Sequence, residues 1–263
     1  DSFGAYFIRF GFSVAIARAL APSDYGLMGM IIIFIAIGNI LTESGFGMAL
    51  IQKKDATNAD FSTIFYFNLI ISIIIYAILF LSSQTIADFY NEPILVNVIR
   101  ISALTIIFGA LSTIQTTILS KELNFKKPTY INWASTIISG TIGVIIAYNG
   151  FAVWALVFQT LAGTIIRLLG LWFTSKWRPS FIFSWKSFKE LYRYGYKIFL
   201  QGASDVVFTK MYYPLIGKSF SSTQLGYYTN ATSFSEILVK QTTISYGRVL
   251  FPAMSKIQDD AEK

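Results

Sequence analysis

Apolar segments long enough to cross a lipid bilayer follow one another along almost the whole chain. A helix needs about 20 mostly apolar residues to cross the hydrocarbon core. We identify eight such segments, at 3–20, 27–50, 61–82, 95–119, 130–148, 151–174, 196–217 and 225–250. Only 13% of the 263 residues are charged, whereas soluble domains carry about 25%. The sequence therefore predicts an all-α polytopic membrane protein.

The chain contains neither cysteine nor histidine, and this limits its chemistry. Disulfides, thiolate nucleophiles, Cys/His zinc sites and histidine-based triads are excluded. The sequence also has no phosphate-loop motif of the G-x-x-x-x-G-K-[ST] type. We therefore expect a transporter rather than an enzyme, with no cofactor and no metal site; H⁺ or Na⁺ would be the coupling ion.

Turn residues separate several of the predicted spans, at 22–26, 91–93 and 149–150. The last of these leaves almost no loop, which predicts a tight hairpin of the fifth and sixth spans. Basic residues collect in alternate loops, 14 on one side against two on the other. The positive-inside rule places the basic side, and with it the N-terminus, in the cytoplasm. The net charge of +7 is thus explained by topology, and we expect no nucleic-acid partner.

The longest polar break lies between the sixth and seventh spans, at 175–197. It alternates aromatic residues with basic ones, a pattern typical of a helix at the membrane surface that contacts anionic lipid. A plain juxtamembrane flank is the alternative. In either case it divides the chain into a six-helix transmembrane lobe at 1–175, a cytoplasmic amphipathic linker at 176–197, and a second region at 198–263.

The first two spans resemble the last two when the chain is compared with itself at an offset of 200 residues. From 16 to 50 there are seven identities in 35 positions, among them Gly26 with Gly226 and Gly47 with Gly247. Parallel repeats are a known transporter architecture. We therefore expect 198–263 to be the first two helices of a second lobe, in a truncated transporter of twelve or more helices. The first span also begins so close to Asp1 that we expect further residues before it.

Ionisable side chains inside spans generally face a bundle interior or a water-filled cavity. Six of them are candidates for a central cleft: Arg9, Glu43, Asp205, Lys210, Glu236 and Lys240. Pairing of Glu236 with Lys240, and of Asp205 with Lys210, to hold helices together is the alternative. A second group lies nearer the span ends and is interpreted as reaching the interface: Arg18, Arg100, Arg167 and Lys218. A buried guanidinium such as that of Arg9 suits a phosphate group, which it can grip with two hydrogen bonds.

Residues 17–27, ARALAPSDYGL, resemble the A-R-x-L-x-P-x-D-[FY]-G-L signature of bacterial polysaccharide transporters. Further stretches resemble the same family in the same order, namely 45–54, 152–157, 225–228 and 252–256. These proteins flip lipid-linked O-antigen and exopolysaccharide units, and they belong to the multidrug/oligosaccharidyl-lipid/polysaccharide export superfamily. The resemblance covers essentially the whole chain, although full members have twelve or more spans.

The resemblance implies two six-helix lobes around a cleft that opens alternately to either side of the bacterial cytoplasmic membrane. It implies a lipid-linked oligosaccharide, an undecaprenyl-diphosphate-linked glycan, as cargo, with membrane lipids and the polysaccharide polymerase machinery as partners. Related flippases line the cleft with cations, a role that suits Arg9 and Arg18. A cation-coupled exporter of drugs or metabolites is the alternative, with Glu43, Asp205 and Glu236 as its acidic residues. A membrane-bound glycosyl- or acyltransferase is a more distant one.

Overall fold

In the computed structural model, residues 2–43 and 45–235 are described, and all their regular structure is helical. The helices are α1 (Ser2–Ala19), α2 (Pro22–Glu43), α3 (Phe46–Gln52), α4 (Asn58–Tyr90), α5 (Leu95–Ser102), α6 (Leu104–Lys121), α7 (Lys126–Tyr148), α8 (Trp154–Thr174), α9 (Trp185–Lys210) and α10 (Tyr212–Ser219). A further helix occupies 222–235, up to the end of the described part.

The predicted spans match these helices, with three breaks that the hydropathy does not show. The second span is divided at Gly45, whose φ of 69° is a left-handed value that favours glycine. The fourth span is divided at Ala103 into α5 and α6, and the seventh at Met211 into α9 and α10. Among the described residues, five stretches are long and apolar enough to cross a membrane, namely Pro22–Gln52, Asn58–Tyr90, Leu95–Lys121, Lys126–Tyr148 and Trp154–Thr174. The eighth predicted span lies partly outside the described residues.

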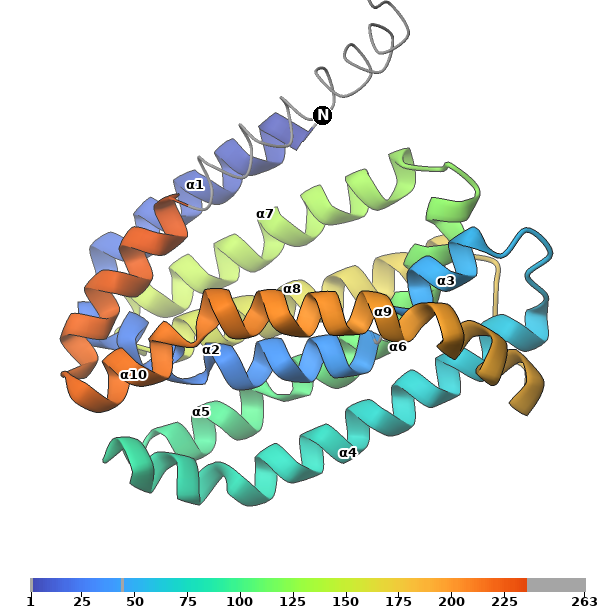
Figure 1. Ribbon diagram of the computed structural model, residues 1–263. Helices are drawn as coiled ribbons and strands as arrows, with labels where there is room; N and C mark the ends of the chain where they lie inside the picture. Colours follow the sequence, from blue (N-terminus) through green and yellow to red (C-terminus); the bar gives the residue numbers. More distant parts are fainter. Residues whose placement is uncertain (1, 44, 236–263) are drawn as a thin grey trace, which may run out of the picture.

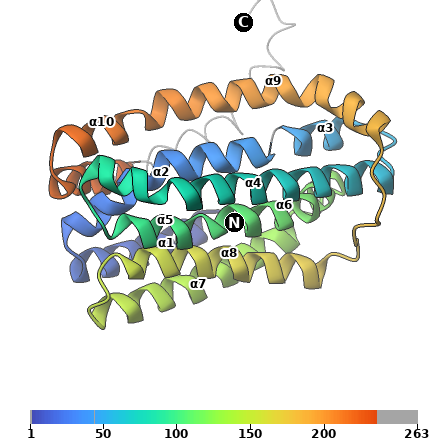
Figure 2. The same cartoon turned by 90° about the horizontal axis from the view of Figure 1, so that it is seen from below.

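The helices run back and forth between two ends of an elongated bundle (Figures 1 and 2). We call the end that carries the connections 53–57, 122–125 and 175–184 the linker end. The end that carries 20–21, 91–94, 149–153 and 220–221 is the turn end. The predicted alternation is therefore confirmed over the described residues. The predicted turn at 22–26 is wrong, because α2 begins at Pro22 and Asp24 accepts a hydrogen bond from the Ala21 backbone amide at 3.1 Å.

At the turn end, α2 crosses the helix 222–235 with its backbone almost in contact. A Cβ atom placed on Gly26 would lie 1.8 Å from the Ser222 carbonyl oxygen, and one on Gly226 would lie 1.6 Å from the Pro22 carbonyl oxygen. Since 22 and 26 correspond to 222 and 226 at the 200-residue offset, the two contacts are reciprocal. We call this contact of Pro22, Gly26, Ser222 and Gly226 the glycine crossing.

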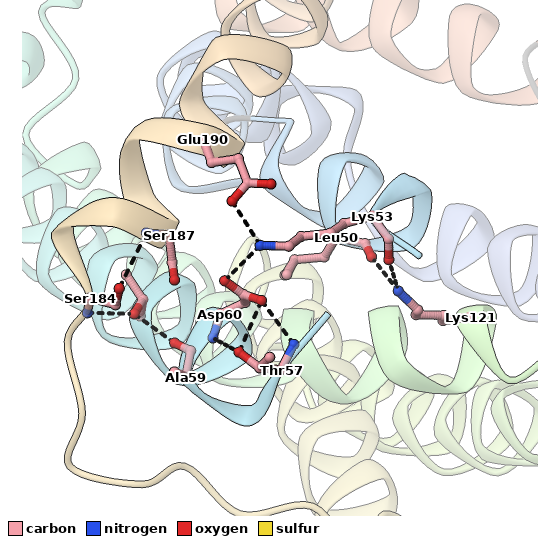
Figure 3. Close-up of polar contacts among 10 residues, drawn as sticks. Leu50, Lys53, Thr57, Ala59, Asp60, Lys121, Ser184, Ser187 and Glu190 are labelled. Carbon is pink, nitrogen blue, oxygen red and sulfur yellow. Dashed lines mark hydrogen bonds and ion pairs between the residues drawn. The ribbon is translucent and has the colours of Figure 1, made fainter. Parts of the chain in front are cut away.

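At the linker end, charged side chains connect α9 to the helices below it (Figure 3). Lys53 Nζ donates to Asp60 Oδ1 at 3.1 Å and to Glu190 Oε2 at 2.9 Å. Asp60 Oδ2 accepts from the Thr57 amide at 2.8 Å, within the capping box that begins α4. Lys121 Nζ donates to the backbone carbonyls of Leu50 and Lys53. These residues, Lys53, Asp60, Glu190 and Lys121 with Thr57 and Leu50, form the lysine network.

The lysine network also fixes the charge of its central residue. Partial burial lowers the pKa of Lys53, but the hydrogen bonds to Glu190 and Asp60 and the attraction of their carboxylates outweigh burial. The pKa of Lys53 therefore lies above its usual value, and the ammonium group stays charged at neutral pH.

The amphipathic segment between the sixth and seventh spans has two parts. Residues 175–184 are non-helical and are held on α4, where the Ser180 amide donates to Ser62 Oγ at 3.0 Å and the Ser184 amide to Thr63 Oγ1 at 2.9 Å. Residues 185–197 are the first half of α9, which continues without a break into the seventh predicted span. The helical part of the predicted linker is thus continuous with the seventh predicted span, because no turn residue interrupts the chain at 197–198.

Candidate functional site

A cavity of about 1150 Å³ lies between α1, α2, α3, α6, α7, α8, α9 and the helix 222–235, which contributes Ser233. Its lining on α6 runs from Gly109 to Ser120 and on α7 from Thr129 to Ser139, which are the halves of these helices nearest the linker end. The glycine crossing, at the opposite end, contributes no residue to it. The cavity therefore lies mainly towards the linker end and reaches on α8 as far as Gln159, whereas the helices at the glycine crossing are closely packed.

The cavity has two unlike walls. One wall comes from α1, α2, α3 and α9 and is largely apolar, with Phe12, Ile40, Met48, Ile51, Ile198 and Phe199. The other comes from α6, α7 and α8 and carries many uncharged polar groups. We call it the hydroxyl wall; its polar residues are Ser112, Thr113, Thr116, Thr117, Ser120, Thr129, Asn132, Ser135, Thr136, Ser139, Gln159, Thr160 and Thr164.

Two arginines and one glutamate supply the charge of the cavity lining. Arg9 projects from the middle of α1, Arg167 from α8, and Glu43 from the end of α2. Glu43 interacts electrostatically with Arg167, but no ion pair within 4 Å joins Arg9, Arg167 or Glu43 to another residue that the structure describes. Among the described residues, the two guanidinium groups thus have no tight carboxylate partner, and they give the described part of the lining a positive balance.

The structure brings some of the predicted site residues together and leaves others apart. Arg9 and Glu43 line the cavity, whereas Arg18, Asp205 and Lys210 are not part of its lining. Arg18 is exposed at the end of α1, Asp205 is exposed on α9, and Lys210 Nζ lies 5.4 Å from the ring centre of Tyr213. Glu236 and Lys240 lie outside the described residues.

Of the four cations that were interpreted as reaching the interface, Arg167 lines the cavity instead. It lies seven residues before the end of α8, which places it about 10 Å inside that helix. Arg100 is held between helices, because its Nε donates to Ser83 Oγ at 3.0 Å and its guanidinium lies 4.3 Å from the ring centre of Phe80. Lys218 Nζ donates to the Phe89 carbonyl at 2.6 Å at the turn end.

The hydroxyl wall was missed by sequence reasoning that considered only ionisable groups. A signal exists on α6, where serine and threonine recur at 112, 113, 116, 117 and 120. This spacing of three and four residues places them along one face of a helix. The same pattern is also typical of helix–helix contacts in membranes, so the spacing alone does not assign the face to a cavity.

The back-and-forth arrangement of helices that are long and apolar enough to cross a bilayer is that of a multi-pass membrane protein. Its fold matches the structure titled "Inward-facing conformation of a multidrug resistance MATE family transporter of the MOP superfamily", with a TM-score of 0.59 and 14% sequence identity. The match covers 87% of this chain and 57% of that one. The chain itself belongs to the polysaccharide biosynthesis protein family, whose model matches residues 15–263.

Two characterised relatives are similar along nearly the whole chain. The succinoglycan biosynthesis transport protein ExoT of Rhizobium meliloti is 22% identical over 260 residues, which is 99% of this chain and 53% of ExoT. The lipopolysaccharide biosynthesis protein WzxC of Escherichia coli is 24% identical over 254 residues, 94% of this chain and 51% of WzxC. The chain thus spans about half the length of these relatives. Family and fold support the prediction of a transport protein rather than an enzyme.

Proposed function

We propose that the complete protein translocates a lipid-linked oligosaccharide across the bacterial cytoplasmic membrane by alternating access. The observation that carries the proposal is the cavity, which combines Arg9 and Arg167 with a hydroxyl wall. Guanidinium groups bind phosphate oxygens with two parallel hydrogen bonds, and hydroxyl and amide groups suit a sugar chain. The charge and the polarity of the cavity therefore both fit a glycan attached to a diphosphate.

The orientation of the cavity fits the same function. With the basic loops of the linker end in the cytoplasm, a cavity next to that end faces the side on which such lipids are made. The packed turn end then closes the path to the outside. Coupling to H⁺ or Na⁺, and delivery of the glycan to a polymerase, belong to this proposal.

The test is the leaflet distribution of the lipid-linked oligosaccharide in cells that lack the full-length gene. We expect the oligosaccharide to accumulate on the cytoplasmic leaflet and wild type to restore its export. Arg9→Ala should reduce export by about 10- to 100-fold, because a charge-assisted hydrogen bond contributes about 1.5–3 kcal/mol. Arg9→Lys should retain part of the export activity, since lysine keeps the positive charge but cannot form two parallel hydrogen bonds with a phosphate group.

Arg100→Ala serves as the matched control, because that arginine contacts Ser83 and Phe80 away from the cavity. It should keep export near the wild-type level at equal protein level in the membrane. Wild-type export by Arg9→Ala would remove Arg9 from the site. A normal leaflet distribution with altered drug tolerance would instead support the exporter, and Glu43→Gln would then be the variant to compare.

A further inference from the structure

Four threonines of the hydroxyl wall donate their hydroxyl protons to backbone carbonyls of their own helices, which composition alone does not show. Thr113 Oγ1 donates to the Gly109 carbonyl at 3.1 Å and Thr116 Oγ1 to the Ser112 carbonyl at 3.1 Å, both within α6. On α8, Thr160 Oγ1 donates to the Leu156 carbonyl and Thr164 Oγ1 to the Thr160 carbonyl, each at 2.9 Å. These threonines use their only proton inside their own helix.

A hydroxyl group that has donated its proton keeps its lone pairs as acceptors. These four threonines therefore present oxygen acceptors to the cavity, whereas Gln159 and Arg167 of α8 supply donors beside them. Such a surface binds a ligand that offers many donors. Neutral sugar units offer them as hydroxyl groups.

The hydroxyl bonds of these threonines do not connect one helix to another. Ser135 on α7 shows the contrast, because its Oγ donates across to the Gly163 carbonyl of α8 at 2.7 Å and joins the two helices. The bonds of Thr113, Thr116, Thr160 and Thr164 stay within one helix, and such bonds do not stabilise a helix. The hydroxyl bond of Ser135 therefore joins two helices, whereas those of the four threonines do not.

Trp133, Asn132 and Gln159 complete the same wall. The indole of Trp133 is half-buried, and a flat aromatic face packs well against the apolar C–H face of a sugar ring. The side-chain amides of Asn132 and Gln159 supply both donors and acceptors. A lipophilic cation would instead require unpaired carboxylates, and the one carboxylate of the described lining, Glu43, faces Arg167.

From these contacts we propose that the hydroxyl wall is a glycan subsite, with Thr113, Thr116, Thr160 and Thr164 accepting hydrogen bonds from sugar hydroxyls. On α8 the subsite adjoins Arg167, which lies one turn beyond Thr164; in this proposal Arg9 and Arg167 bind the diphosphate and the threonines bind the sugars. The inference rests on the proposed function and deepens it, because it assigns the sugar part of the cargo to α6, α7 and α8. It predicts that the wall distinguishes carriers by the length of their glycan.

The experiment compares two carriers with the full-length protein reconstituted in proteoliposomes. One carrier is the prenyl diphosphate with the complete oligosaccharide, and the other is the same lipid with only its first sugar. The test variant is the triple substitution Thr116→Val, Thr160→Val and Thr164→Val, since valine keeps the shape of threonine and removes the acceptor. Thr141→Val is the control, because Thr141 makes the same type of bond, to the Ile137 carbonyl at 2.9 Å, outside the cavity lining.

We expect the triple variant to reduce transfer of the complete oligosaccharide by about tenfold or more, as several hydrogen bonds are lost. Transfer of the one-sugar carrier should stay within about twofold of wild type, and Thr141→Val should change neither. Equal loss of both carriers, or no loss of either, would overturn the glycan subsite while wild-type transfer upholds the proposed function. Failure of wild type to transfer either carrier would overturn the proposed function itself.

Discussion

The glycine crossing and the lysine network hold the two ends of the same bundle by opposite means. At the turn end, α2 and the helix 222–235 approach so closely that Gly26 and Gly226 have no space for a Cβ atom. At the linker end, α9 is connected through Lys53, which is 21% exposed, to Glu190, which is 56% exposed. The first contact depends on shape, and the second on charges that water and salt can replace.

This difference matches the position of the cavity. In the proposed function the cavity opens at the linker end, and ion pairs that water and salt can replace are suited to such an end. At the glycine crossing, α2 and the helix 222–235 can part only if both backbones move away from each other. Such a contact is suited to the end of the bundle that is closed in the proposed function. The comparison thus predicts that substitutions in the glycine crossing cost far more stability than substitutions in the lysine network.

The largest effect is expected from Gly226→Val. Its Cβ would lie 1.6 Å from the Pro22 carbonyl oxygen, and a backbone atom cannot move aside as a flexible side chain does. We expect a loss of more than about 3 kcal/mol, seen as a lower melting temperature or as failure to accumulate in the membrane. Gly11→Ala is the control, because nothing lies within 4 Å of a Cβ at that position. A melting temperature of Gly226→Val equal to that of wild type would contradict the larger stability contribution expected from the glycine crossing.

The smaller variant Gly226→Ala keeps this test interpretable if valine prevents folding. Its single methyl group meets the same carbonyl oxygen, so a clear decrease in melting temperature is still expected. Tolerance of alanine would show that the two helices can move apart at little cost. The contacts at the turn end would then contribute no more stability than those at the linker end.

A second glycine contact lies towards the linker end, and it sharpens the comparison. Gly45 has a φ of 69°, and a Cβ there would lie 2.4 Å from the Gly195 carbonyl oxygen of α9. We expect Gly45→Ala to lose about 2–3 kcal/mol in thermal unfolding, from backbone strain and the close contact together. Gly202→Ala is the control on α9, since its Cβ would make an ordinary 3.8 Å contact with Ile40. A loss at Gly45→Ala as large as at Gly226→Val would assign glycine packing to both ends.

These three glycines also show what the sequence could and could not predict. The helices and their alternation follow from hydropathy, and the 200-residue offset pairs Gly26 with Gly226 without any structure. The offset does not show that the two glycines meet, since repeats can also be far apart. The kink at Gly45 lies within a continuous apolar run, where no hydropathy pattern marks it.

The site was only partly predictable for a related reason. Arg9 was predicted to face a cleft because a charged side chain in the middle of a span generally faces a bundle interior or a water-filled cavity, and it lines the cavity in the structure. Arg167 was assigned to the interface because depth was judged from the helix end alone, and the direction of a side chain depends on how α8 is rotated against its neighbours. The threonines of α6 and α8 carry no charge, and their role depends on hydrogen bonds that only the structure shows.

The smallest effect is expected from Lys53→Met, which removes both ion pairs of the lysine network. The Asp60 side chain is 2% exposed, but it keeps its hydrogen bonds from Thr57. We therefore expect a loss of about 1–2 kcal/mol, below the cost of a fully buried broken pair. Lys54→Met is the control, because the neighbouring lysine is exposed and outside the network.

Salt separates this contact from the glycine crossing. The difference in melting temperature between wild type and Lys53→Met should shrink as NaCl rises from about 0.05 M to 1 M, because salt screens exposed charges. The difference between wild type and Gly226→Ala should stay constant, since screening does not change a steric contact. If both differences were independent of salt, the linker end would be held by packing too. The opening of the cavity would then require the helices themselves to move, and not only the exchange of Lys53 and its partners with water.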